Sequence, residues 1–307
     1  MEEDALKPND IREFEIHSLA EYEEMIFSWN NSTQYVYRGT TQIIPLLTHC
    51  SSLKRKIDKL GINNQIDSSD FELFLIEKFK EIYRNEYTYN NPLELLEIMQ
   101  HFEIPTRLLD TTTDPLVALF FACQPDTEKK DKDGCVYVIP TYAITGLEPI
   151  VEILSETAKW IKAGEADISS IYQKCVSRAP KADWDYDRDI ETLKGILRGD
   201  ILTKLDPVTN NQCKQSGSFI LTMNRFDRNS ECIENELTCI SGTSPIDKTV
   251  PSDIIIRKEE KAKILKELET REITKETLLP DRHIVNFYKA KMHDYMNEYE
   301  SKAEKKV

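Results

Sequence analysis

The sequence predicts an α+β fold, in which helices and strands are mixed rather than arranged in repeating pairs. Apolar residues recur at helical spacing in several separate segments. Short runs rich in Val, Ile, Tyr and Phe, bounded by Gly or Pro, lie between those segments and indicate strands. The two kinds of segment do not alternate regularly, whereas a doubly wound parallel sheet requires such alternation. We therefore expect an α+β domain.

The first expected elements are a helix and a strand. Residues 18–29, SLAEYEEMIFSW, place their apolar side chains on one helical face, namely Leu19, Tyr22, Met25, Ile26 and Trp29. Residues 34–40, QYVYRGT, are rich in strand formers and reach a glycine that could turn the chain. We expect residues 1–31 to form a helical extension ahead of the main domain.

Three helices are expected next. Residues 66–87 carry apolar side chains near helical spacing and begin with Ser and Asp residues that can cap a helix. Residues 92–102 start with a proline, which suits the first helical turn. In the segment TDPLVALFFAC, Thr113 or Asp114 can cap a helix whose first position is Pro115. The caps therefore predict where each of these helices begins.

The second half of the chain continues the mixture of elements. Residues 141–206 look largely helical, and we expect them to be an insertion in a main domain that spans residues 32–285. Residues 286–307 read as a charged C-terminal helix that fades into a frayed tail. Strands are expected at residues 134–140, 215–223 and 253–258, a helix at 258–271, and a turn with a packed Leu pair at 273–281.

The composition favours a packed domain with a charged surface. Hydrophobic residues make up 40% and charged residues 31%, and the formal net charge is −14. Because coating nucleic acid requires a concentrated positive surface, this charge disfavours that class of protein but leaves a local basic groove open. The N-terminal MEEDALKPND lacks the apolar segment of a secretory signal, and no apolar run approaches the ~20 residues of a membrane span. We expect a cytoplasmic protein without a membrane partner.

The patterns of cysteine, histidine and glycine disfavour several familiar sites. The seven cysteines and five histidines are scattered without CxxC, CxxH or HExxH spacing, so we expect reduced thiols and no metal site. The sequence also lacks a Gly-rich dinucleotide fingerprint, a phosphate-binding P-loop and a GxSxG elbow. A Rossmann oxidoreductase, a P-loop enzyme and a typical serine hydrolase are therefore disfavoured.

The strongest candidate for a functional site is the segment MQHFEIPTRLLDTTTDPLVALFFAC, residues 99–123. Its polar residues include Gln100, His101, Arg107, Asp110, Thr111, Thr112 and Thr113. Arg107 and Asp110 could pair with each other, and the threonines precede a helix whose free N–H groups favour an anion. The alternative is a capping region with an internal ion pair. A helix end needs only a few polar partners, so their number favours a site.

Two residues outside this segment are further candidates. Arg38 ends a predicted strand, where an arginine is commonly a solvated charge. Its planar guanidinium nevertheless matches phosphate oxygens, and Gly39 would let a ligand approach the backbone. Gln215 stands ahead of Gly217 and an apolar strand, where a glutamine is more often structural. We retain Arg38 as an anion-binding candidate and Gln215 as a polar group of the same site.

These segments together resemble the FRG-domain family. The family shows an aromatic-Arg-Gly motif, a Q-H-aromatic-x-x-P-T-R-L-L-D signature followed by a Thr-rich turn and an ALFFA helix, a Q-x-G-x-F element and a closing IT..TL.PD element. The resemblance spans residues 35–281. The family often carries an arginine about one turn before the glutamine. This chain has Asn211 near that place, and Arg225 is a possible substitute. The matching segments are residues 37–39, 100–110, 118–122, 215–219 and 254–281.

The FRG pattern is in turn similar to that of ADP-ribosyltransferases, which show a YRG-like arginine, an STS-like strand before a helix and a late Glu or Gln in this order. The resemblance implies a single split β-sheet core with surrounding helices, and NAD⁺ as the substrate. The residues implied to bind NAD⁺ are Tyr37, Arg38, Gly39, Thr111, Thr113, Arg107 and Asp110. Those implied to be catalytic are Gln215, His101 and Thr112. Because a glutamine cannot act as a base, auxiliary groups are needed, and the candidates are Asp110, His101, Glu231 and Glu234.

We therefore expect an NAD-dependent ADP-ribosyltransferase of the toxin or anti-phage defence type. It would transfer ADP-ribose to RNA or protein and could have an antitoxin or chaperone partner. Arg38 would bind the NAD⁺ phosphates, and polar groups near the ribose would stabilise the oxocarbenium character that develops as the nicotinamide–ribose bond breaks. Two alternatives stay open: a non-catalytic module that binds a nucleotide or a protein, and an NAD glycohydrolase.

Overall fold

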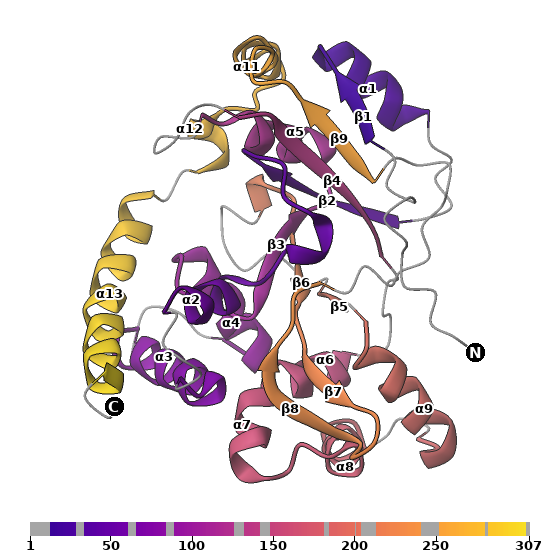
Figure 1. Cartoon of the computed structure of the whole chain (residues 1–307), viewed down its shortest axis with the longest axis vertical. Coiled ribbons are helices and arrows are strands. Elements are labelled where there is room, and N and C mark those ends of the chain that lie inside the picture. Colours follow the sequence, from indigo (N-terminus) through magenta and orange to yellow (C-terminus); the bar gives the residue numbers. More distant parts are fainter. Residues whose placement is uncertain are drawn as a thin grey trace.

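The structure is a computed structural model, and it describes the chain in eleven segments. These are residues 13–28, 34–60, 66–83, 89–125, 132–141, 148–180, 184–199, 201–203, 213–240, 252–279 and 282–304. Within them, helices and strands are mixed without regular alternation (Figure 1). The predicted α+β class is therefore confirmed.

The centre of the fold is a seven-stranded mixed sheet with the order β1-β9-β4-β2-β3-β6-β5. The edge strand β1 is parallel to β9, and every other neighbouring pair is antiparallel. A separate two-stranded hairpin is formed by β7 and β8. In sheet order the strands are β1 (Glu13–Ile16), β9 (Asp253–Ile256), β4 (Gly134–Thr141), β2 (Gln34–Thr40), β3 (Leu108–Thr112), β6 (Gly217–Leu221) and β5 (Ile201–Thr203), and the hairpin holds β7 (Asn224–Asp227) and β8 (Cys232–Leu237).

The sheet is weakly joined between its two central strands. β2 pairs with β4 over its whole length, from Gln34 opposite Thr141 to Thr40 opposite Cys135. Its register with β3 has a single pair, Tyr37 opposite Thr112. Beyond this pair the two strands diverge, so the sheet opens at its middle.

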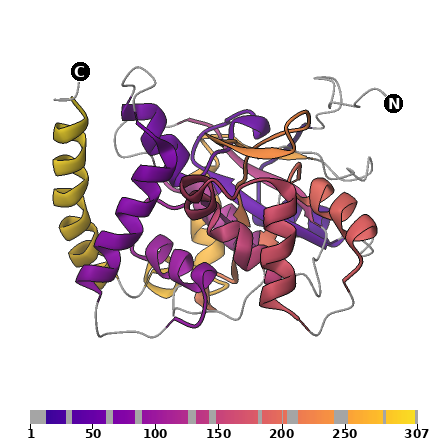
Figure 2. The same cartoon turned by 90° about the horizontal axis from the view of Figure 1, so that it is seen from below.

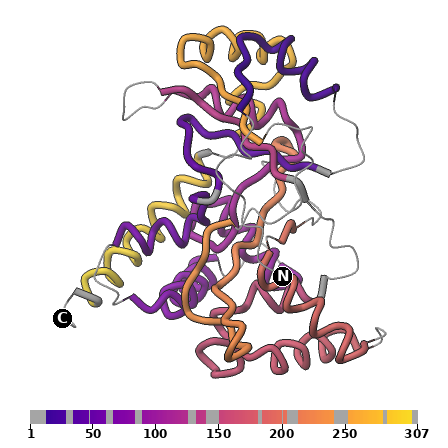
Figure 3. Tube along the Cα trace, turned by 45° about the vertical axis from the view of Figure 1, so that its right-hand side comes forward, coloured from indigo at the N-terminus to yellow at the C-terminus, as the bar shows by residue number. Residues whose placement is uncertain are grey.

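Helices cover the sheet and extend beyond one end of it. α1 and α11 lie at one end of the molecule, whereas α6 to α9 and the β7–β8 hairpin lie at the other (Figures 1 and 3). α13 runs beside α3 (Figures 1 and 2). The helices are α1 (Leu19–Phe27), α2 (Ser52–Leu60), α3 (Ser68–Ile82), α4 (Pro92–His101), α5 (Pro115–Cys123), α6 (Glu148–Ser155), α7 (Thr157–Ala163), α8 (Ile168–Arg178), α9 (Tyr186–Ile196), α11 (Lys261–Glu269), α12 (Lys275–Leu278) and α13 (Arg282–Glu304), with a 3-10 turn at Leu46–Thr48.

Predicted caps begin α3 and α5, and α4 begins at the predicted proline. Asp67 accepts a hydrogen bond from the Asp70 backbone N–H at the start of α3, at 2.8 Å. Asn91 caps α4, whose first residue is the proline expected there. Asp114, rather than Thr113, caps α5. Local capping signals therefore fix these three starts.

α5 is the apolar helix at the centre of the fold, and two glycines let it approach the sheet. A Cβ atom on Gly39 would lie 1.9 Å from the Ala118 carbonyl oxygen, and one on Gly134 would lie 2.2 Å from that of Ala122. Neither distance is physically possible, so both strands need glycine where the helix crosses them. Gly39 therefore serves helix packing, and it also lines the cavity described below.

The expectation of a separate N-terminal helical extension is wrong, whereas the expected C-terminal helix is present. β1 lies in the predicted N-terminal extension, yet it pairs with β9 in register from Glu13 opposite Asp253 to Ile16 opposite Ile256. The N-terminal segment is thus part of the core sheet. The C-terminal helix α13 also packs firmly, because the Tyr288 ring lies 4.3 Å from that of Phe102. Val285, Tyr288, Met292 and Met296 are buried, so α13 is part of the main core.

The expectation that all cysteines are reduced is also wrong. Cys50 and Cys239 form a disulfide across an antiparallel bridge, although they are 189 residues apart in the sequence. The other five are free, and three of them, Cys123, Cys135 and Cys175, are buried. The pairing depends on a long-range backbone bridge, which cysteine spacing cannot reveal. Among the described helices, none combines the length and the apolar character needed to cross a membrane.

Candidate functional site

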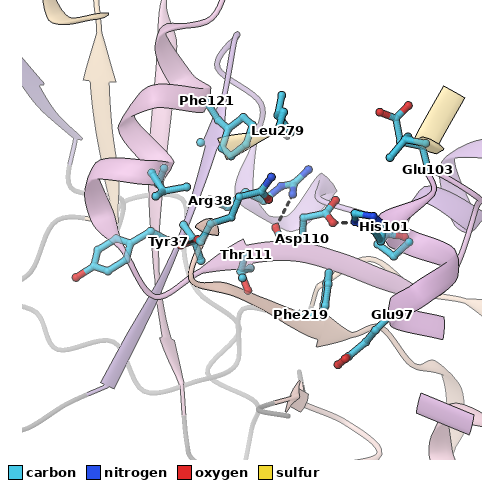
Figure 4. Close-up of a pocket in the computed structure, with 18 residues that line it drawn as sticks. Tyr37, Arg38, Glu97, His101, Glu103, Asp110, Thr111, Phe121, Phe219 and Leu279 are labelled. Carbon is cyan, nitrogen blue, oxygen red and sulfur yellow. Dashed lines mark hydrogen bonds between the residues drawn. The ribbon is translucent and has the colours of Figure 1, made fainter. Parts of the chain in front are cut away.

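A cavity of about 300 Å³ lies where β2 and β3 separate (Figure 4). Strands β2, β3 and β6 contribute to its lining, together with α4, α5 and the segment around the end of α12 and the start of α13. Val117, Ala118, Phe121, Leu279 and Val285 form an apolar wall. The polar side chains on the lining include Arg38, Gln100, His101, Asp110, Thr111 and Gln215. Segments far apart in the sequence thus share one cavity, as we expected.

Arg38 extends from β2 across the opening toward β3. Its Nη1 donates a hydrogen bond to the Asp110 backbone oxygen at 2.6 Å. If the β2–β3 ladder continued, Asp110 would lie opposite Gly39, so the guanidinium takes the place of a ladder hydrogen bond. The Arg38 Nε is buried and has no hydrogen-bond partner among the described residues. Burial lowers the pKa of Arg38 from its usual value, and the negative charge of Asp110 opposes this shift.

A chain of hydrogen bonds leads from β3 to the Asp110 carboxylate through Gln100. The Gln100 side-chain oxygen accepts from the Thr106 hydroxyl at 2.7 Å and from the Ser52 hydroxyl at 3.2 Å. Its Nε2 donates to Asp110 Oδ1 at 2.9 Å. The two hydroxyl donors determine which end of the amide is the oxygen, so the nitrogen must face Asp110. Gln100 thus holds Asp110 at the cavity.

The threonine triplet clamps the turn that leads into β6. Thr112 Oγ1 donates to the Gln215 carbonyl oxygen at 2.6 Å, and the Thr113 backbone N–H donates to that of Ser216 at 3.0 Å. Thr111 Oγ1 lies 2.8 Å from the Ser218 hydroxyl and donates to its carbonyl oxygen at 3.0 Å. Thr111 and Thr112 line the cavity, whereas Thr113 is exposed outside it. The hydroxyls therefore position β6 beside β3, and Thr113 is not at the cavity as predicted.

Gln215 joins the same turn to the opposite rim of the cavity. Its Nε2 donates to the Leu278 carbonyl oxygen at 2.9 Å, at the end of α12. The next residue, Ser216, has a φ of 46°, which lies in the left-handed region that non-glycine residues seldom adopt. The Thr112 and Thr113 hydroxyls both contact the Ser216 carbonyl oxygen, at 3.3 Å in each case. These contacts hold the Gln215 side chain against the cavity.

The N-terminus of α5 is not the anion site that the sequence suggested. Asp114 caps it, because its Oδ1 accepts from the Leu116 N–H at 2.8 Å. A carboxylate already satisfies the helix end and would repel a phosphate there. The first helical residue, Pro115, also has no N–H to offer. Within the cavity, the guanidinium of Arg38 is left as the group suited to an anion.

Arg107 belongs to the core and not to the cavity. Its Nε donates to Glu72 Oε1 at 2.7 Å and its Nη2 to Glu72 Oε2 at 2.5 Å, so the two side chains form a two-point ion pair. Its Nη1 donates to Asn224 Oδ1 at 3.1 Å. Arg107 is only 1% exposed and Glu72 3%. The predicted pairing of Arg107 with Asp110 is therefore wrong, and Arg107 joins α3 to β3 instead of binding a ligand.

Tyr37 and His101 both line the cavity, but their side chains point in different directions. The Tyr37 ring points away from Arg38 and Asp110 (Figure 4) and belongs to the apolar cluster around α5. Burial raises the pKa of Tyr37 to about 12, so its hydroxyl stays protonated at neutral pH. His101 lies at the end of α4, beside Asp110 and facing the cavity. Tyr37 thus supports the strand, while His101 is placed to meet a ligand.

The remaining auxiliary candidates lie away from the cavity. Glu231 pairs with Lys194 at 2.6 Å, and Glu234 pairs with Arg225, whose Nε lies 2.6 Å from it. Because Arg225 is paired with Glu234, it does not substitute for the arginine that the family carries near residue 211. Asn211 itself lies outside the described residues. The charges on the β7–β8 hairpin are thus part of another surface.

The structure adds lining residues that sequence reasoning did not select. Glu97 faces the cavity from α4 and is 1% exposed, and Glu103 lies beyond His101, where it pairs with Lys289 of α13. Phe219 lines the cavity from β6. The one available signal was the spacing of Glu97 and His101, which are four residues apart and so share a helical face. α13 could not be connected to this site from the sequence.

Comparison with known proteins supports the family that the sequence resembles. Residues 33–132 match the FRG domain. This range contains Arg38, Gln100, Asp110 and the threonine triplet, and it ends ahead of Gln215. No curated protein and no solved structure shows a significant match to the chain. Residues 33–132 are therefore identified as an FRG domain within the longer chain.

Proposed function

We propose that the cavity binds NAD⁺ and that the protein is an ADP-ribosyltransferase of the toxin or anti-phage defence type. Arg38 binds the phosphates, and the reacting ribose lies toward His101 and Gln215. The opening of the sheet between β2 and β3 is consistent with the split core of that enzyme class. The acceptor of ADP-ribose is an RNA or a protein, and an antitoxin or chaperone keeps the protein in check in its host.

The observation that carries this proposal is the state of Arg38. Its guanidinium lines a cavity, yet among the described residues it forms no ion pair, and its buried Nε has no hydrogen-bond partner. Removing a guanidinium from water lowers the stability of its charged form unless an anion compensates. A phosphate offers oxygens that match the planar guanidinium. An anionic ligand would therefore complete the surroundings of Arg38.

The size and the walls of the cavity support a ligand with both apolar and charged parts. Its volume of about 300 Å³ lies at the lower end of the range for ligand pockets, so it would hold one nucleoside end of a dinucleotide, with the remainder outside. The side chains of Val117 and Phe121 on α5 offer an apolar surface to an aromatic ring. Arg38 lies between this wall and Asp110, where a phosphate joins the two halves of such a ligand.

The test is incubation of the protein with NAD⁺ labelled in its adenylate part, together with a cell lysate. We expect label to enter RNA or protein, and we expect Arg38→Ala to abolish it. Expression of the wild-type chain without a partner should slow growth, whereas Arg38→Ala and Thr112→Ala should be tolerated. Equal toxicity of the wild type and both variants, with no labelled product, contradicts the proposal. Release of free ADP-ribose without labelled macromolecule identifies an NAD glycohydrolase instead.

One observation favours a second candidate, a non-catalytic binding module. The Gln215 amide N–H is used in the contact with the Leu278 carbonyl oxygen, and the Thr112 hydroxyl is used in the contact with Gln215. Both side chains then serve the architecture of the cavity and not chemistry. NAD⁺ binding in calorimetry without any turnover of labelled NAD⁺ would support this module.

A further inference from the structure

We infer that Asp110 is the catalytic carboxylate of the cavity and that Gln100 is the positioning residue that aims it. This inference rests on the proposed ADP-ribosyl transfer. It identifies the base that the transfer reaction still needs. An acceptor hydroxyl must lose a proton as it attacks the ribose, and Gln215 has no basic group to take it. Neither Glu231 nor Glu234 reaches the cavity. The base must therefore be another group on the cavity, placed where it can accept the proton of the acceptor hydroxyl.

Asp110 is the carboxylate that lies beside Arg38. Arg38 donates to the Asp110 backbone oxygen, at 2.6 Å, and not to its carboxylate. Asp110 is exposed to the cavity and lies between Arg38 and His101 (Figure 4). Among the described residues, its side chain accepts one hydrogen bond, from Gln100. An ionised carboxylate has room for further donors, so an acceptor hydroxyl can bind to it.

Gln100 has its orientation fixed from behind. The Leu108 backbone N–H donates to Thr106 Oγ1 at 3.1 Å, and the Thr106 hydroxyl donates onward to the Gln100 oxygen at 2.7 Å. Ser52 supplies a second hydroxyl at 3.2 Å. In each of these hydrogen bonds the donor faces toward Gln100, whose amide nitrogen in turn donates to Asp110. Hydrogen bonds arranged in such a chain strengthen one another. A side chain needed only for packing would not require this arrangement.

The step itself is balanced. The bond between ribose C1′ and the nicotinamide nitrogen breaks, and its electron pair leaves with nicotinamide, which becomes neutral. An acceptor oxygen forms the new bond to C1′ and gives its proton to the free Asp110 oxygen, from which the proton passes to water. The products are nicotinamide, the ADP-ribosylated acceptor and one proton. Arg38 holds the phosphates throughout.

The test measures NAD⁺ binding and turnover separately in the full-length protein. Calorimetry gives the dissociation constant for NAD⁺, and release of nicotinamide from nicotinamide-labelled NAD⁺ in cell lysate gives the rate. Asp110→Asn keeps the shape and can still accept from Gln100. We expect it to lower the rate at least ~100-fold, the scale of general acid–base catalysis, while the NAD⁺ dissociation constant changes less than about threefold. Asp187→Asn, on the exposed start of α9, is the matched control and should match the wild type.

Gln100→Glu tests the positioning role with a change of similar shape. It places two carboxylates in contact, and like charges hold a proton to higher pH than one carboxylate does. The acid limb of the rate profile should therefore move to higher pH, an effect that lost packing would not produce. Asp110→Asn with more than a third of the wild-type rate, or with rate and affinity reduced in the same proportion, overturns the inference while turnover stands. A wild-type protein that releases no nicotinamide overturns the proposed function and this inference together.

Discussion

Arg107 directly precedes strand β3 and Arg38 donates a hydrogen bond to it, and the surroundings of the two arginines are opposite in character. Arg107 stands just before the strand and is buried against Glu72 and Asn224, with its donors paired to a carboxylate and an amide. Arg38 reaches the same strand from β2, and its contact there is with a backbone carbonyl. Arg107 lies in the core between α3 and the sheet, whereas Arg38 lies on the lining of a cavity.

The difference distinguishes an arginine used for folding from one available to a ligand. A buried guanidinium with a two-point carboxylate partner has its charge compensated within the protein. Arg38 has no such partner among the described residues, and burial correspondingly lowers its pKa. Its compensation must come from water or from a bound anion. Perturbing the two sites should therefore affect different quantities, stability at Arg107 and binding at Arg38.

The largest expected effect is on stability, from Glu72→Ala. It leaves the Arg107 guanidinium buried without a carboxylate, and breaking a buried ion pair in this way typically costs about 3–5 kcal/mol. Urea denaturation at neutral pH should show this loss in the free energy of unfolding. As a control, the double change Glu72→Leu with Arg107→Met removes both charges and should recover most of it. A single variant as stable as the wild type would show that the pair is not needed to hold α3 on the sheet.

The second effect concerns His49, which lies close to Arg38. Burial, with a contribution from the Arg38 charge, lowers the pKa of His49 from 6.5 to about 4. In the unfolded chain His49 binds a proton as the pH falls below about 6.5. In the folded protein it does not bind that proton until about pH 4. His49 thus contributes stability above pH 6.5 that is lost as the pH falls toward 4, by the order of 1.4 kcal/mol per pH unit.

Urea denaturation at pH 7.5 and pH 5 measures this loss, with His49→Gln as the comparison. The wild type should lose on the order of 2 kcal/mol more than the variant between those two conditions. Arg38→Met should also flatten the pH dependence, because it removes the positive charge that contributes to the low pKa of His49. An identical pH dependence in the wild type and His49→Gln would place the His49 ring in water rather than in the core.

Local features of the fold could be read from the sequence, because they depend on residues close together in the chain. The side chains of Asp67, Asn91 and Asp114 each accept a hydrogen bond from a backbone N–H within one helical turn, so caps of this kind can be read from the local sequence. The pairing of β1 with β9 could not be predicted, since it joins the two ends of the domain through backbone contacts. The same holds for the disulfide, whose two cysteines meet at a bridge formed by distant segments.

The candidate site shows the same division. The motifs predicted that Arg38, the threonines and Gln215 come together, and the structure places Arg38, Thr111 and Gln215 on one cavity. The partners of individual polar groups could not be predicted, because the tertiary fold determines which charged side chains lie next to each other. Arg107 forms its ion pair with Glu72, which lies 35 residues earlier on α3, and not with the nearby Asp110. The roles assigned to the residues on the cavity stay predictions.

The third effect tests the packing of α5 behind the cavity. Gly39→Ala places a Cβ atom 1.9 Å from the Ala118 carbonyl oxygen, so β2 or the helix must move. Overpacking of this kind typically costs about 1–3 kcal/mol, and thermal denaturation should show it. Gly195→Ala is the matched control. Nothing lies within 4 Å of its new Cβ, and in helix α9 it should stabilise by about 0.5–1 kcal/mol. Equal melting temperatures for the wild type and Gly39→Ala would mean that α5 is not seated on β2.

The smallest expected effect on stability comes from Arg38→Met. This variant tests directly whether Arg38, unlike Arg107, serves binding and not folding. The change removes one hydrogen bond to the Asp110 carbonyl, which faces a cavity where water can replace it, and it also removes a charge that burial disfavours. The two consequences oppose each other, so the free energy of unfolding should change by less than about 1 kcal/mol. Affinity for NAD⁺, in contrast, should fall at least ~10-fold, because charge-assisted hydrogen bonds to the phosphates are lost. Calorimetry and urea denaturation on the same preparation separate the two quantities. If Arg38→Met lowers stability as much as Glu72→Ala and leaves NAD⁺ affinity unchanged, Arg38 is a second structural arginine and the cavity is not built around it.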